Sequence, residues 1–77
     1  MVLDALKMQT RDDAHIYLKE EFRFPDYYGE NLDALYDCLC GVQFVYVQIV
    51  NMTPDNKYAA RVIHVMRMAG VDVEIIE

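Results

Sequence analysis

The segment at residues 42–50, VQFVYVQIV, constrains the fold of this 77-residue chain more than any other. Its residues are mostly β-branched or aromatic and its hydrophobicity is nearly continuous, which is typical of a strand buried on both faces of a parallel sheet. Parallel strands cannot be joined by a tight turn and are usually connected through helices. The segment therefore predicts a central strand in a small α/β protein.

The residues on either side supply the other elements. A short first strand is expected at residues 2–3, and helices are expected at about 11–21, 32–40 and 54–69. Residues 71–75 alternate apolar side chains with acids, which predicts a last strand with one wet face at the edge of the sheet. The order strand, helix, helix, strand, helix, strand predicts a three-stranded parallel sheet packed by about three helices.

Polar residues are expected to cap each of these helices. Thr10, with Asp13 three residues later, resembles a capping box for the first helix. Asn31 can accept an N–H group from the first turn of the second helix. Thr53 and Pro54 are expected to be the N-cap and first residue of the third. Because the chain has only 77 residues, we expect it to form a single domain over residues 1–77.

The second helix has an apolar side and an acidic side. At about 100° per residue, its leucines fall on one stripe, whereas Asp33 and Asp37 lie well off it and point to solvent. Like charges one helical turn apart cost roughly 0.2–0.5 kcal/mol, which a cationic partner could recover. Gly41 is expected to end the helix as a left-handed residue. The leucines are Leu32, Leu35 and Leu39.

The negative charge of the chain is concentrated around this helix. The formal net charge is −6, and residues 20–37 hold six acids and one base. Such a field repels nucleic acids and anionic membranes, and it accelerates association with a basic partner. Exposed acids are often only solvated, but Tyr27, Tyr28 and Tyr36 surround these acids, and tyrosines are typical anchors of protein interfaces. The pattern favours a surface that contacts a basic protein.

Other chemistry has little support in the sequence. Cys38 and Cys40 point in nearly opposite directions on a helix, so they cannot bridge each other. His15 and His64 do not complete a zinc-type spacing with them, so neither a metal nor a cofactor is expected. We interpret His15 as a surface helix residue. The first ten residues lack the basic and long apolar regions of a secretory signal, which predicts a cytoplasmic protein.

The stretch PDYYGENLDALYDCL, Pro25 to Leu39, resembles the signature of the barstar family, intracellular inhibitors of a secreted ribonuclease. The resemblance implies the same α/β architecture and an antitoxin or immunity protein that blocks the active site of a basic ribonuclease. It implies that Asp37 is the main phosphate mimic, that Asp33 assists it, and that Tyr27 stacks against the catalytic histidine of the enzyme.

The resemblance also implies a wider contact surface. Asn31 and Gly41 would shape its rim, and Tyr36 takes the place of a family tryptophan. The predicted partner-binding residues are Tyr27, Tyr28, Asn31, Asp33, Ala34, Tyr36, Asp37, Cys40, Gly41 and Val42.

The chain departs from the family beside this helix. Val42 replaces an interface aromatic residue, and Val65 replaces a contacting acid. The stretch between the central strand and the last helix is shorter than in the family, which suggests that a short helix is missing. Arg61 and His64 would repel a basic enzyme. These departures favour a related but different ribonuclease or toxin as partner.

Two other functions stay open at this point. The domain could serve as an adaptor or self-associating module with a non-nuclease partner, including a homodimer through the same face. The third hypothesis is an enzyme that uses Asp33 and Asp37 as an acid–base pair. Such carboxylates must flank a substrate from opposing walls, and these two share one exposed helix face. The sequence therefore disfavours catalysis.

Overall fold

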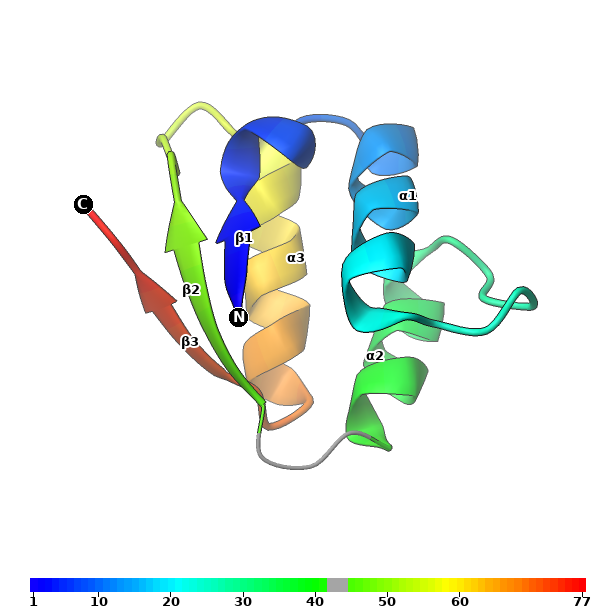
Figure 1. The fold of residues 1–77 in the computed structure, drawn as a ribbon. Coiled ribbons are helices and arrows are strands. Elements are labelled where there is room, and N and C mark those ends of the chain that lie inside the picture. The colour runs from blue at the N-terminus through cyan, green and yellow to red at the C-terminus, as the bar shows by residue number, and fades with distance from the viewer. Residues whose placement is uncertain (42–44) are drawn as a thin grey trace.

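The computed structural model describes residues 1–41 and 45–77 and confirms the predicted α/β fold (Figure 1). The predicted order of strands and helices is observed, with a 3-10 turn added after the first strand. Residues 42–44, at the predicted start of the central strand, lie outside the described residues, and Val45, also predicted to be in the strand, precedes its observed start at Tyr46. The elements are β1 (Val2–Asp4), η1 (Ala5–Lys7), α1 (Arg11–Phe22), α2 (Leu32–Cys40), β2 (Tyr46–Val50), α3 (Lys57–Met68) and β3 (Asp72–Ile75).

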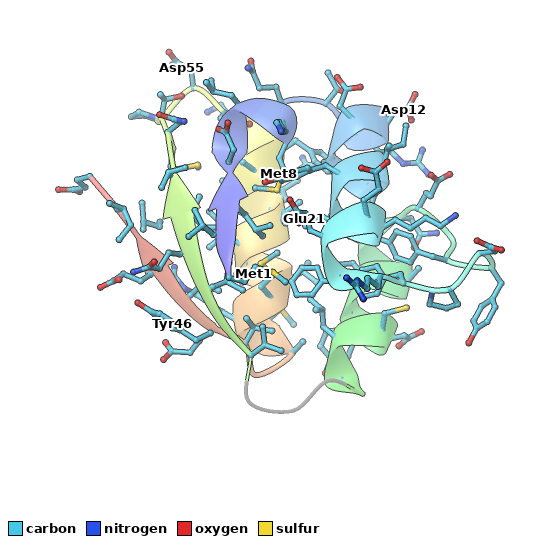
Figure 2. All side chains as sticks on the ribbon, viewed as in Figure 1. Met1, Met8, Asp12, Glu21, Tyr46 and Asp55 are labelled. Atoms are coloured by element: carbon cyan, nitrogen blue, oxygen red, sulfur yellow. The ribbon has the colours of Figure 1, made fainter. Side chains whose placement is uncertain are left out.

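The strands form one parallel sheet in the order β1-β2-β3, so β2 is central and β3 is at an edge. The helices all lie on the same side of this sheet (Figure 1). Val47 and Ile49 on β2 face the helices and are fully buried, whereas Tyr46 is 44% exposed on the other side. Figure 2 shows Tyr46 on that open side. The prediction that β2 is buried on both faces is therefore wrong, because the fold has helices on one face only.

Two of the three predicted N-caps are confirmed. The Thr10 hydroxyl accepts the backbone N–H of Asp13 at 3.2 Å, and α1 begins at Arg11 as expected. The Asn31 side-chain oxygen accepts the backbone N–H of Ala34 at 2.8 Å at the start of α2. Each bond satisfies a donor that the first helical turn leaves unpaired.

The predicted start of α3 is wrong by three residues. Its N-cap is Asn56 rather than Thr53, and Asn56 accepts the backbone N–H of Ala59 at 3.1 Å. The Asn56 amide also donates to the Ala5 carbonyl at 2.8 Å, so one buried side chain joins α3 to η1. Residues 51–56 form turns and no helix between β2 and α3, in agreement with the shortened connection that the sequence suggests.

The helix ends also differ from expectation at one position. Gly41 follows α2 with φ −86°, so the predicted left-handed conformation is wrong there. Gly70, after α3, does adopt it with φ 91°, as does Arg23 at the end of α1 with φ 55°. In residues 1–41 and 45–77, no helix is long and apolar enough to cross a bilayer.

The core lies between the sheet and the helices. Leu35 and Leu39 on the inner side of α2 are fully buried, and α2 packs against α3. The predicted leucine stripe is therefore confirmed, with Leu32 only partly buried at its end. This packing fixes which side of α2 faces solvent.

Candidate functional site

A short loop between α1 and α2 forms one part of the site. The left-handed Arg23 ends α1, and the backbone N–H of Phe24 then bonds to the Lys19 carbonyl at 3.0 Å. The Pro25 carbonyl accepts the backbone N–H of Tyr28 at 2.9 Å, which closes a turn. The proline sets its own φ and favours this turn.

The two tyrosines of this loop point in opposite directions. Tyr27 is 87% exposed, whereas Tyr28 is 5% exposed and packs against Phe24 with ring centroids 4.8 Å apart. Burial raises the pKa of the Tyr28 phenol. Tyr27 is therefore available to a partner, and Tyr28 attaches the loop to the core.

The loop is joined to α2 through Asn31. Besides capping the helix, the Asn31 amide donates to the Gly29 carbonyl at 3.1 Å. A Cβ atom at Gly29 would lie 3.3 Å from the Ala34 Cβ atom, which is tighter than most such contacts. Glu30, between Gly29 and Asn31, has φ 52°, a left-handed conformation that non-glycine residues seldom adopt. The chain is therefore tightly constrained just before α2.

The outer side of α2 carries the acids. Asp33 and Asp37 are both exposed, one helical turn apart. Within the described residues, neither carboxylate makes a hydrogen bond or ion pair; the salt bridge of this region joins Lys19 and Asp26 at 3.8 Å. Two carboxylates therefore face solvent from a helix whose inner side is buried.

Tyr36 and Cys40 complete the outer surface of α2. Tyr36 is 39% exposed, and Cys40 is exposed one turn later. A hydrogen bond with Cys40 raises the pKa of the Tyr36 phenol. Gly41 is exposed at the end of the helix and Ala34 is half-buried, while Val42 lies outside the described residues. Apart from the buried Tyr28, the predicted contact residues that the structure describes are all at least partly exposed.

His15 is not the surface residue that the sequence suggests. It has no exposed area, its Nδ1 lies 2.5 Å from the Tyr28 hydroxyl, and its Nε2 lies 2.5 Å from the Tyr58 hydroxyl. Burial lowers the pKa of the imidazole. Helical spacing could have identified it, because at about 100° per residue His15 lies beside Leu18 and Phe22 on the inner side of α1.

A basic stripe lies on α3. Lys57, Arg61 and His64 are exposed at successive turns. Val65 is half-buried. In the part of the chain that the structure describes, no three His, Cys, Asp or Glu side chains are grouped to hold a metal ion. The distinctive chemistry of the site is therefore acidic and aromatic.

A family model described as "Barstar (barnase inhibitor)" matches residues 1–71, which include both the loop and α2. This chain belongs to the barstar family. The chain is also similar to a Bacillus subtilis (strain 168) protein named "Putative ribonuclease inhibitor YrdF", to which it is 46% identical over 41 residues. That match spans 53% of this chain and 45% of the relative, so less than half of the relative is covered.

Proposed function

We propose that this barstar-family protein is an intracellular antitoxin or immunity protein that inhibits a basic ribonuclease by placing the acids of α2 in its active site. The observation that carries the proposal is the pair of exposed carboxylates, Asp33 and Asp37, beside the exposed Tyr27 and Tyr36. The name of the Bacillus subtilis relative supports the same role.

The chemistry of the acids suits such a target. A ribonuclease active site binds phosphates with arginine, lysine and histidine, and carboxylates form charge-assisted hydrogen bonds with the same groups. The Asp33 and Asp37 carboxylates would occupy phosphate positions without offering a bond to cleave. Because Leu35 and Leu39 anchor α2 in the core, little conformational entropy is lost on binding.

Each side chain has a distinct role in this proposal. Asp37 is the central phosphate mimic, Asp33 assists it, and Tyr27 stacks against the catalytic histidine of the enzyme. Tyr36 contributes an aromatic contact in place of a tryptophan. Asn31 and Gly41 would shape the rim, Ala34 and Cys40 are further proposed contacts, and Tyr28 supports the loop that carries Tyr27.

A direct test uses a panel of small basic ribonucleases and measures inhibition and affinity. Asp37→Ala should cost more than about 2 kcal/mol, as expected for a central desolvated charge, which is roughly a 30-fold loss at 1.4 kcal/mol per factor of ten. The matched control is Asp55→Ala. It removes the same charge from an exposed position in the β2–α3 connection, far from α2 (Figure 2).

The salt dependence gives a second readout. Affinity and association rate should fall as salt rises, since exposed charges steer the encounter. If Asp33→Ala and Asp37→Ala both leave inhibition intact, the proposal is wrong.

The second candidate is an adaptor or self-associating module that uses the same face. It is favoured by Tyr36 in place of the family tryptophan and by the turn at residues 51–56 where a short helix is missing. Light scattering reports a dimer, and capture experiments with and without Asp33 and Asp37 report a non-nuclease partner. A monomer that is captured only by a ribonuclease excludes this alternative.

A further inference from the structure

A chain of three polar side chains, two of them buried and Tyr58 partly buried, crosses the domain from α3 to the loop before α2. The His15 ring on α1 lies between two tyrosine hydroxyls, with Tyr28 of the loop at Nδ1 and Tyr58 of α3 at Nε2. The Tyr28 ring is tilted against His15 and the Tyr58 ring meets it edge-on, with centroids 5.7 Å and 5.6 Å away. We call these three residues the tyrosine–histidine clamp.

The loop has few other anchors. Of residues 25–30, Tyr28 alone is buried, and its neighbours on both sides are exposed. The backbone of the loop is held by the Pro25–Tyr28 turn and by the Asn31 amide at Gly29. The orientation of Tyr28 therefore determines where the adjacent Tyr27 emerges from the surface.

We propose that His15 and Tyr58 are positioning residues for the partner-binding loop, holding Tyr28 so that Tyr27 is presented in one conformation. The expected effect on partner affinity rests on the proposed function. The positioning of the loop by His15 and Tyr58 does not depend on it. Tyr58 lies on α3 and is not among the predicted contact residues, so its effect on a partner would pass through His15.

In a neutral imidazole the two ring nitrogens have different roles in hydrogen bonding. One ring nitrogen donates and the other accepts, so one tyrosine hydroxyl accepts and the other donates. Protonation turns both nitrogens into donors. The hydroxyl that donated to His15 must then rotate to accept, and its own proton loses a buried partner, which is costly. The clamp is therefore complete only when His15 is neutral.

The surroundings of His15 favour that neutral form. Burial is the main cause of its lowered pKa, and Arg11 on α1 adds to it. Glu30 in the loop and Asp12 on α1 act in the opposite direction. The charged or titratable groups around the two tyrosines are Cys38 of α2 and Glu30 near Tyr28, and Arg11 and Arg61 near Tyr58.

The direction of the pH dependence follows from this lowered pKa. In the unfolded chain His15 titrates near the ordinary value of 6.5. Above that pH both states are neutral and the clamp contributes fully. As pH falls from 6.5 toward the lower pKa of the folded state, the unfolded chain binds more protons, so the contribution is lost.

The test compares Tyr58→Phe with Tyr17→Phe. Both substitutions remove one hydroxyl and its hydrogen bond. The Tyr17 hydroxyl accepts the backbone N–H of Asp4, on β1, at 2.9 Å. The measurement is the rate of chymotrypsin cleavage after Tyr27, which reports local opening of the loop. Tyr58→Phe should raise this rate roughly 2- to 10-fold, as loss of one hydrogen bond allows, and Tyr17→Phe should not.

Ribonuclease affinity gives the second readout, and it should fall for Tyr58→Phe alone. If the wild type binds no ribonuclease, the proposed function is overturned. Loop cleavage needs no partner, so it tests the clamp in that case too. Wild-type cleavage should also rise, relative to an unstructured peptide substrate, as pH falls below 6.5, and His15→Gln should lose this pH dependence. The clamp is overturned if Tyr58→Phe leaves loop cleavage unchanged, or if both phenylalanine variants raise it equally.

Discussion

The acid proposed to matter most for binding should reduce the stability of the free protein. Asp37 lies one turn after Asp33 and in the last turn of α2, where no basic residue offsets it. The C-terminal end of a helix carries partial negative charge, so an anion there is unfavourable. Replacing Asp37 by Asn removes the repulsion by Asp33 and by the helix end, and it leaves the shape of the side chain unchanged.

The expected gain can be worked out from these two contacts. A like-charge pair one turn apart costs roughly 0.2–0.5 kcal/mol, and a charge at the wrong helix end costs roughly 0.3–1 kcal/mol at low ionic strength. Asp37→Asn should therefore raise the free energy of unfolding by about 0.5–1.5 kcal/mol at low salt. Asp33 lies in the first turn, where the dipole favours an anion. Asp33→Asn loses that stabilisation as it relieves the repulsion, so its net effect should be near zero.

Urea unfolding of the three proteins at low and at high salt measures both effects. The difference between Asp37→Asn and wild type should shrink as salt screens the charges, and the dependence of the unfolding free energy on urea should stay unchanged. The reasoning is refuted if Asp37→Asn is no more stable than wild type at low salt, or if Asp33→Asn is stabilised as much.

Three further predictions test the fold. Gly70→Ala should lower the unfolding free energy by about 1–2 kcal/mol, the cost of a left-handed alanine, while Gly41→Ala, at φ −86°, should change it little in the same thermal or urea unfolding assay. Leu39→Ala should cost about 2–5 kcal/mol, because the side chain is fully buried in the core; a smaller loss in calorimetry would mean that α2 is not tightly packed. Asn56→Ala should cost about 1–3 kcal/mol, because it removes a helix cap and one of the two hydrogen bonds that the Ala5 carbonyl accepts, the other coming from the Met8 backbone N–H. A stability equal to wild type would contradict that role.

The sequence predicts those parts of the molecule that depend on local chemistry. Thr10 and Asn31 cap their helices as expected because each bond spans only three residues. The solvent-facing positions of Asp33 and Asp37 follow from helical periodicity once the leucines face the core. The resemblance of the loop and α2 to the barstar family also predicts the α/β architecture.

The errors occur where distant segments decide the outcome. Asn56 replaces Thr53 as the cap because its amide also reaches the Ala5 carbonyl, 51 residues earlier. Helical spacing could have placed His15 on the inner side of α1, but its hydrogen-bond partner Tyr58 lies 43 residues later in the chain. The left-handed Glu30 has no local sequence signal, since such a conformation in a non-glycine residue is maintained by its surroundings. Side-chain partners of this kind are not visible in a pattern of apolar and polar residues.

The parallel sheet has a consequence for how this surface could be imitated. The proposed contact residues that the structure describes fall within one stretch of chain, residues 27–41, and a synthetic peptide of that length would contain them all. Yet α2 has nine residues, and isolated helices shorter than about 12–15 residues are marginal in water. The support of α2 comes from α3, which packs against β3 of a sheet whose paired strands lie far apart in the sequence, such as Val2 opposite Gln48. We therefore expect the peptide to be largely unstructured, and the surface to arise only when the whole domain folds cooperatively.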